Sequence, residues 1–344
     1  MNPVSVTCPI PLQRYPHVLM AHGGGGRLMH QLIQEMFLAV FQPEPEWQHD
    51  AACLTLSGQQ LAFTTDSYVV TPLFFPGGDI GSLAVHGTVN DLAMAGARPR
   101  YLSLSLIVEE GLPMETLWRV VQSIKAAAEQ AQVRIVTGDT KVVDRGKGDG
   151  LFINTAGIGL IEQDAPIGPT VVQAGDAVIV SGDIGRHGIA ILSARAGLTF
   201  ETTVSSDSAA LTAPVLALVR QCPVHCLRDL TRGGLASALN EIALSAQRSI
   251  HLDASAIPVD EEVEGACELL GLDPLYIANE GRFVAFVPAA AAETALACLR
   301  EFNPTATLIG KVTDIQIAQV VLQNAIGSQR LLDFLSGEQL PRIC

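Results

Sequence analysis

Five aspartates lie at predicted strand ends or in loops, where a fold of alternating strands and helices gathers its polar side chains. Hard divalent cations take oxygen ligands, and Mg²⁺ commonly bridges a few carboxylates to the oxygens of a triphosphate. Each aspartate alone also has an ordinary alternative role, because Asp at a strand end often caps a turn or a helix. The five are Asp50, Asp66, Asp91, Asp139 and Asp229.

Asp91 is the best single candidate of the five. It lies in a mostly apolar stretch with helical spacing, where an aspartate without a partner would be costly to bury.

A run of glycines, Gly23–Gly26, follows His22 and leads into apolar residues at helical spacing. Glycine lets backbone N–H groups approach an anion closely, and the start of a helix adds partial positive charge. The run is not a Walker A loop, because no Gly-Lys-Ser/Thr follows. It is not a G-x-G-x-x-G motif either, because position 28 is Leu. A flexible connection is the alternative interpretation.

Two further residues could act on a substrate. Lysine occurs only at positions 125, 141, 147 and 311, and Lys141 lies in a segment rich in Gly, Asp and Lys. There it could stabilise the charge of a transferring phosphate or position a substrate, although a solvated loop lysine fits the spacing equally well. Glu280, before a predicted strand, would be a general base if its surroundings raise its pKa. A turn residue is the alternative.

The seven cysteines are an odd number without clustered spacings, which favours a reduced, cytoplasmic protein. The last residue is Cys344. A mobile tail that ends in a nucleophilic thiol can travel between sites, Pro341 would stiffen its approach and Arg342 could anchor it through anionic contacts. Cys222-x-x-His225-Cys226 is too sparse for a metal site, so we expect buried thiols there.

These residues must be positioned by an α/β or α+β architecture, because strand-like and helix-like segments alternate along the chain. A change of composition near 165–175 predicts a boundary between two domains. We expect an N-terminal extension at 1–16, domains at 17–165 and 170–335, and a flexible tail at 336–344. Expected helices are 28–40, 80–95, 113–130, 186–196, 207–220, 234–247 and 289–302. Expected strands are 52–56, 61–65, 101–108, 134–136, 151–160, 177–180, 282–287 and 320–322, with a Gly/Asp/Lys-rich loop after 136.

Composition excludes several classes of partner. The formal net charge is −14, whereas nucleic acids and anionic membranes attract cationic proteins. No apolar stretch approaches the roughly 18–20 residues of a membrane span. The first 20 residues have no basic segment before an apolar run, so no signal peptide is expected. Hydrophobic residues make up 48%, enough for a large core.

Ten motifs in order resemble one known family, the hydrogenase-maturation carbamoyl dehydratases (HypE type). The match runs from about residue 17 to the end, and the terminal Pro341–Cys344 is the discriminating motif. The middle motifs are shared with a wider ATP-using superfamily that includes aminoimidazole ribonucleotide synthetase and selenophosphate synthetase. The motifs are His22–Gly26, Asp50–Ala52, Thr65–Val70, Phe75–Gly78, Gly87–Asp91, Gly138–Lys141, Asn154–Gly157, Asp229–Gly234, Asn279–Gly281 and Pro341–Cys344.

The resemblance implies a two-domain aminoimidazole ribonucleotide synthetase-like fold and a homodimer built through the N-terminal domains. It also implies that ATP is held together with Mg²⁺ by the glycine run and the five carboxylates. The nucleotide-binding residues that it implies are Gly23, Gly24, Gly25, Asp66, Thr88, Asn90, Asp139, Asn154 and Thr231. The implied metal ligands are Asp50, Asp91 and Asp229.

The implied reaction takes place on the tail. In the family, a carbamoyltransferase partner (HypF type) loads carbamoyl onto the terminal thiol, here Cys344. ATP then drives loss of water to give a thiocyanate. The cyano group passes to a small maturation complex (HypC–HypD type) that builds the iron centre of nickel–iron hydrogenases. By the same resemblance Lys141 orients the substrate and stabilises charge, and Glu280 abstracts a proton.

Two alternatives remain at this point. One is another ATP-dependent enzyme of the superfamily, such as a selenophosphate synthetase, in which Cys344 has no role. Cys8 resembles the N-terminal cysteine of those enzymes, but the lysine expected beside it is missing. The other is a non-catalytic scaffold that presents its tail to maturation proteins. Residues 2–16 lie outside the match, and we assign them no function.

Overall fold

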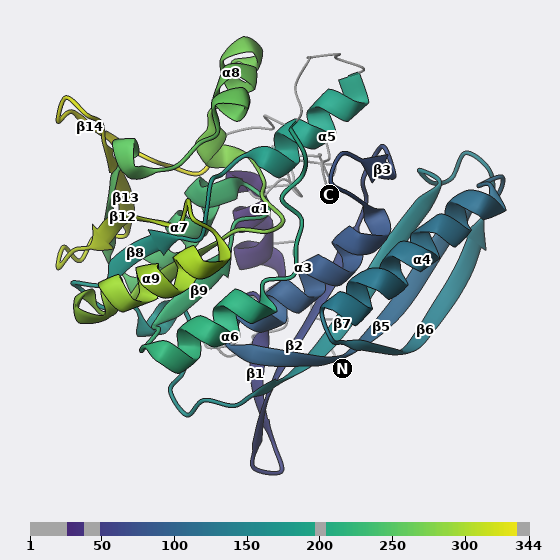
Figure 1. Ribbon diagram of the computed structural model, residues 1–344, viewed down its shortest axis with the longest axis horizontal. Helices are drawn as coiled ribbons and strands as arrows, with labels where there is room; N and C mark the ends of the chain where they lie inside the picture. Colours follow the sequence, from purple (N-terminus) through teal and green to yellow (C-terminus); the bar gives the residue numbers. More distant parts are fainter. Residues whose placement is uncertain (1–25, 38–48, 197–203, 336–344) are drawn as a thin grey trace, which may run out of the picture.

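A computed structural model describes residues 26–37, 49–196 and 204–335. Two β-sheets, one in each half of the chain, organise this part of the molecule (Figure 1). In the described residues no helix combines the length and the apolar character that crossing a membrane requires.

The first sheet has five strands in the order β1-β2-β7-β5-β6. Neighbouring strands are antiparallel except for β5 and β6, which are parallel. The strands are β1 (Ala52–Leu56), β2 (Gln59–Tyr68), β5 (Ala97–Glu109), β6 (Arg134–Val143) and β7 (Leu151–Ile161). A two-stranded ribbon of β3 (Phe74–Phe75) and β4 (Gly78–Asp79) precedes the first long helix.

The segment after residue 136 was predicted to be a loop, and this prediction was wrong for residues 137–143. Strand β6 continues to Val143 because it pairs in parallel with β5 along its whole length, from Arg134 opposite Tyr101 to Val143 opposite Glu109. This long-range pairing stabilises Gly138 and Asp139 in a strand although both types are depleted in strands.

Two helices, α3 (Ile80–Met94) and α4 (Met114–Gln130), cover one face of the first sheet (Figure 1). The helix predicted at 80–95 is confirmed as α3, and the Asp79 carboxylate caps its start by accepting from the N–H groups of Gly81 and Ser82. Helix α3 is buried on almost every side because it lies between this sheet and the second domain, where Met94 packs against Leu211 and Val215.

Among the described residues, the other face of the first sheet is left uncovered. Phe63, Ile158 and Tyr101 are cross-strand neighbours on this face, and they are 42%, 41% and 45% exposed. Three large apolar side chains side by side in solvent are unusual for a monomeric protein.

The second sheet has seven strands in the order β14-β13-β10-β12-β8-β11-β9, with only β10 and β13 parallel. Alternate side chains of β8 pack into two hydrophobic clusters on opposite faces of the sheet. Val178 and Val180 belong to one cluster, and Ala177 and Ile179 belong to the other. Both faces are therefore covered. The strands are β8 (Ala177–Val180), β9 (Cys226–Asp229), β10 (Ser249–Asp253), β11 (Phe283–Val287), β12 (Thr307–Val312), β13 (Gln319–Gln323) and β14 (Gln329–Leu331).

Helix α7 packs on one face of this sheet, and α6 and α9 pack on the other. The predicted helix at 207–220 begins only at Thr212, because residues 204–211 have no regular secondary structure and are bonded to neighbouring segments. The helices are α5 (Arg186–Ala196), α6 (Thr212–Gln221), α7 (Gly234–Ala246), α8 (Glu261–Leu270) and α9 (Ala292–Phe302). The sequence analysis missed β9, β10, α8, β12 and β14.

The helix predicted at 28–40 is present in its described part as α1 (Arg27–Leu32), followed by a π-helical segment, Ile33–Phe37. It contacts the end of the second domain, where the Arg27 N–H donates to the Leu335 carbonyl and its guanidinium pairs with Asp333 at 2.6 Å. The start of this helix is thereby placed beside the junction of the two domains (Figure 1).

Candidate functional site

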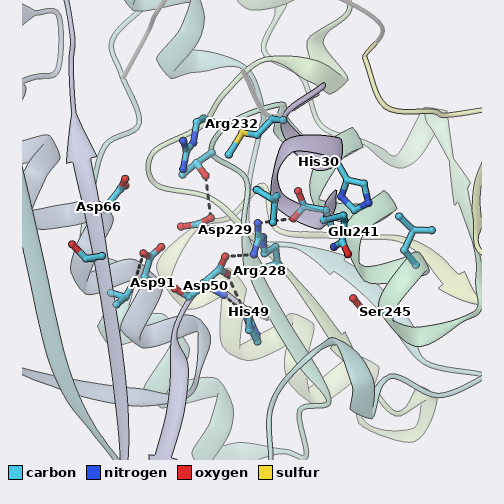
Figure 2. A pocket seen from close by; sticks show the side chains of 18 of the residues that line it. His30, His49, Asp50, Asp66, Asp91, Arg228, Asp229, Arg232, Glu241 and Ser245 are labelled. Atoms are coloured by element: carbon cyan, nitrogen blue, oxygen red, sulfur yellow. Dashed lines mark hydrogen bonds and ion pairs between the residues drawn. The ribbon is translucent and has the colours of Figure 1, made fainter. Parts of the chain in front are cut away.

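A cavity of about 700 Å³ lies between the two domains. The first domain contributes Asp50, just before β1, Asp66 in β2 and Asp91 in α3. The second contributes Arg228 and Asp229 at the end of β9, with Thr231 and Glu241. Figure 2 shows the three aspartates, Arg228, Asp229 and Glu241 together with His30 of α1, and Met29 of the same helix also lines the cavity.

Three carboxylates meet in this cavity. One oxygen from each of Asp50, Asp91 and Asp229 lies within 4.8 Å of the other two. They are the only such group of metal-ligating side chains among the residues that the structure describes. These are the three residues that the resemblance implies as metal ligands, and hard oxygen donors of this kind suit a divalent cation.

The three carboxylates have very different proton affinities. Desolvation, followed by the negative charges of Asp229 and Asp50, raises the pKa of Asp91 well above its ordinary value. Desolvation and the charge of Asp50 raise the pKa of Asp229 to about 7. Burial alone would raise the pKa of Asp50, but the neighbouring Arg228 guanidinium and His49 hold it below the ordinary value. A cation in the cavity would relieve the repulsion among them.

Arg228 joins the two domains at this point. Its guanidinium contacts the Asp50 carboxylate across the domain junction and pairs with Glu241 of α7 at 2.7 Å (Figure 2). The sequence analysis missed Arg228, His49 and Glu241 as site residues. The position of Arg228 directly before Asp229 was the one signal that could have found it.

Two buried polar atoms at the trio have no hydrogen-bond partner among the described residues. They are Nε2 of His49 and Oδ2 of Asp50. The imidazole is oriented by the Asp50 N–H, which donates to His49 Nδ1 at 2.6 Å, so that Nε2 carries the proton. Buried polar groups are nearly always satisfied, and an unsatisfied donor beside an unsatisfied carboxylate oxygen fits a phosphate next to a cation.

Hydroxyl groups orient the other two carboxylates. Thr64 lies 2.8 Å from Asp91 Oδ2, and Thr231 donates to Asp229 Oδ1 at 3.2 Å. Asp66 and Thr231, two of the expected nucleotide-binding residues, line the cavity. Asn154 does not line it, but its amide donates to the Asp66 carbonyl at 2.8 Å.

Three of the other predicted residues do not line the cavity. Thr88 is buried and bonded to Tyr68 and Thr155. The Asn90 amide is bonded to the segment at 209–211 and to the backbone of Glu280, and Glu280 is 4% exposed.

Asp139 and Lys141 lie away from the cavity, in the exposed strand β6. They pair with each other at 3.2 Å, and their side chains are 62% and 71% exposed. The remaining predicted residues, Gly23, Gly24, Gly25, Pro341, Arg342 and Cys344, lie outside the described part of the chain.

The Cys222–Cys226 segment behaves as expected of core thiols. Both cysteines are buried, and His225 pairs with Asp176 at 2.8 Å.

Family models cover most of the chain. A model described as "AIR synthase related protein, N-terminal domain" matches residues 48–161, and one described as "AIR synthase related protein, C-terminal domain" matches residues 173–323.

Whole proteins of one type also match at high identity. Carbamoyl dehydratase HypE of Cupriavidus necator is 51% identical over 332 residues, which cover 94% of this chain and 94% of that protein. The crystal structure of hydrogenase maturation protein HypE in complex with ATP has a TM-score of 0.81 and 51% identity, over 95% of this chain and 100% of that one. A chain of a HypE–HypF complex has a TM-score of 0.83 and 43% identity, over 88% of this chain and 99% of that one. The chain therefore belongs to the HypE family of carbamoyl dehydratases, within the AIR synthase related proteins.

Proposed function

We propose that this chain is an ATP-dependent carbamoyl dehydratase that converts a carbamoyl group on the Cys344 thiol into a thiocyanate for the iron of nickel–iron hydrogenases. The observation that carries the proposal is the carboxylate trio at the domain junction, in a chain 51% identical to a carbamoyl dehydratase and 51% identical to a HypE solved with ATP.

The trio fits Mg²⁺ because Asp50 Oδ2 is an unsatisfied buried acceptor and the other two carboxylates repel each other in its absence. Asp50, Asp91 and Asp229 would hold the ion, which supplies charge neutralisation for triphosphate oxygens. The His49 Nε2–H is placed to donate to a phosphate oxygen. The glycine run with Asp66, Thr88, Asn90, Asp139, Asn154 and Thr231 completes the proposed nucleotide site.

The chemistry requires a better leaving group than an amide oxygen. Transfer of the γ-phosphoryl group to the carbamoyl oxygen, with loss of one N–H proton, gives an S-linked phosphoryl imidate and ADP. Cleavage of the C–O bond with removal of the second N–H proton gives the nitrile and phosphate. Glu280 takes that second proton, Lys141 compensates charge, and Cys344 carries the substrate, with Pro341 and Arg342 positioning the tail.

A homodimer built on the uncovered face of the first sheet accounts for two observations. It would bury Phe63, Tyr101 and Ile158, and it would give the exposed Lys141 a site in the second copy. Obligate interfaces are apolar in the way this face is. A HypF-type carbamoyltransferase and a HypC–HypD-type complex are the proposed partners, the first supported by the solved HypE–HypF complex. We propose a cytoplasmic location for this chemistry.

Mass spectrometry of the C-terminal peptide tests the function. The full chain is incubated with the carbamoyltransferase, carbamoyl phosphate and ATP. A carbamoyl adduct on Cys344 should lose the mass of one water only when ATP is present. Cys344→Ala should carry neither adduct, whereas the control Cys53→Ser, a partly exposed thiol in β1, should behave as wild type. An unchanged adduct in Cys344→Ala would sink the proposal, as would an ATP-dependent product that survives deletion of the last four residues.

A further inference from the structure

A segment without regular secondary structure at residues 204–211, which we call the interdomain strap, runs between the two domains along α3 to the start of α6 (Figure 1). It is bonded to the first domain at both ends. The Ser206 N–H donates to the Pro76 carbonyl at 2.8 Å, and the Leu211 N–H donates to Asn90 Oδ1 at 2.7 Å. The strap thereby has a fixed position relative to α3.

Asp207, in the middle of the strap, holds the backbone at Glu280. Its side chain is fully buried, with Oδ1 accepting from the Glu280 N–H at 3.2 Å and Oδ2 from the Gly281 N–H at 3.0 Å. Hydrogen bonds to an ionised carboxylate are stronger than neutral ones, so this pair fixes two successive peptide groups.

Asn90 holds the same residue from the opposite side. Its Nδ2 group donates to the Glu280 carbonyl at 3.3 Å and to the Ala209 carbonyl at 3.0 Å. The Ala209 N–H also points to the Glu280 carbonyl, at 3.4 Å. The backbone N–H and C=O of Glu280 are therefore both bonded to groups outside its own segment.

The packing at this point leaves no room for a side chain after Glu280. A Cβ added to Gly281 would lie 1.9 Å from the Asp207 carbonyl oxygen. Strap and loop are therefore in direct backbone contact, and the position of one determines the position of the other.

We propose that Asp207 and Asn90 are positioning residues that aim Glu280 at the N–H proton of the phosphorylated carbamoyl group. The inference rests on the proposed function. Asn90 is adjacent to Asp91 on α3, so one rigid helix would set both the carboxylate trio and the proton acceptor. Displacing a reacting group by about 1 Å can lower the reaction rate about a hundredfold, so residues that fix the position of Glu280 would affect the rate strongly.

If the Glu280 carboxylate were displaced from its position, the ratio of ADP to thiocyanate would change. Phosphoryl transfer from ATP would continue, but removal of the second N–H proton would slow. Water would then attack the phosphorus of the waiting imidate, which releases phosphate and regenerates the carbamoyl group. More ADP than thiocyanate would be formed. A variant that merely lowers the folded fraction would reduce both products in the same proportion.

Asp207→Asn and Asn90→Asp in the full chain test the inference. Both keep side-chain size, and each removes contacts on one side of Glu280. We expect thiocyanate formation to fall about tenfold and ADP to exceed thiocyanate in both variants. The KM for ATP should stay within about twofold of wild type in Asp207→Asn, which lies outside the proposed nucleotide site. The control is Asp253→Asn, which neutralises another carboxylate that accepts from a backbone N–H, at an exposed turn of the same domain, and should keep one ADP per thiocyanate.

The outcomes separate the two proposals. ADP and thiocyanate falling together, or unchanged rates, would overturn the positioning roles. Glu280→Gln is measured in parallel, and we expect it to form ADP without thiocyanate. If Glu280→Gln still makes thiocyanate at the wild-type rate, then Glu280 is not the proton acceptor and the proposed mechanism fails at that residue, whatever the strap variants do.

Discussion

The carboxylate trio at the domain junction and the Asp139–Lys141 pair on β6 have opposite surroundings, although both belong to motifs expected in one active site. The trio comes from three elements of two domains and is enclosed, with the Asp50 side chain only 5% exposed. The pair comes from one strand and is mostly in solvent. Lys141 and the Thr140 N–H lower the pKa of Asp139, whereas the pKa values of Asp91 and Asp229 are raised.

The carboxylate trio is assembled from the residues of one chain, whereas the Asp139–Lys141 pair has few neighbours in the described part of the chain. The trio has its orienting hydroxyls, its Arg228 and a cavity within one chain. In the described part of the chain, Lys141 pairs with Asp139 in solvent, on the edge strand of a sheet whose apolar face is exposed there. In the proposed homodimer, a second copy of the chain would complete the surroundings of Lys141.

The largest expected effect follows from removing one ligand of the trio. Asp91→Asn keeps the side-chain shape but replaces a charged oxygen, and we expect ATP-dependent thiocyanate formation to fall more than about a hundredfold. Because the charged form of Asp91 is repelled by its neighbours, the metal-free variant should be at least as stable as wild type. Product mass and urea unfolding measure the two effects. Full maturation activity in this variant would instead support a non-catalytic scaffold.

Arg228 is expected to contribute strongly to the free energy of unfolding, because it pairs with a buried carboxylate of the other domain. Arg228→Gln would leave the Asp50 carboxylate buried without its cation and should lower the free energy of unfolding by about 3–5 kcal/mol. The matched control is Arg98→Gln, which breaks an exposed pair with Glu162 and should cost less than about 1 kcal/mol. Equal losses in urea unfolding of the two variants would contradict the interdomain role of Arg228.

The raised pKa of Asp229 gives the metal-free protein a pH dependence of known sign. The folded state binds this proton more tightly than the unfolded state, so the contribution is full below about pH 4 and is lost as the pH rises through about 7. His86, whose pKa burial lowers to about 4, acts in the opposite sense over much of this range. The measure is therefore the difference between wild type and Asp229→Asn.

We expect wild type to lose a few kcal/mol relative to Asp229→Asn between pH 5 and pH 8 in chelator, since each pKa unit corresponds to about 1.4 kcal/mol. Saturating Mg²⁺ should remove the loss, because the ion binds the deprotonated carboxylates. If the free energies of unfolding of the two proteins changed in parallel with pH in chelator, the three carboxylates would not repel one another as described.

The local part of this comparison was predictable from the sequence. Asp79 before an apolar helix, with Gly96 just past its end, marks α3 correctly because capping chemistry acts within one turn. Asp50, Asp91 and Asp229 were among the five aspartates singled out for their type and position, and the structure brings these three together.

The rest depends on contacts between distant residues, which one sequence does not display. The segment at 207–211 has helix-compatible composition, yet its bonds to Asn90 and to the 280–281 backbone hold it in a non-helical conformation as part of the strap. Strand β6 runs through Asp139 and Lys141 because β5 pairs with it. Arg228 was missed because its partner Asp50 lies in the other domain.

The smallest expected effect on the single chain is that of Lys141→Ala, because Lys141 makes only an exposed contact with Asp139. Tm and nucleotide binding should stay at wild-type values while thiocyanate formation falls. If Lys141 serves the second copy, mixing Lys141→Ala with Asp91→Asn after reversible dissociation should restore activity. Half of the randomly paired dimers would be mixed, each with one intact site, so about a quarter of the wild-type rate is expected. No recovery from mixed dimers, confirmed by differential tagging, would place Lys141 in its own chain's site and remove the contrast between the two regions.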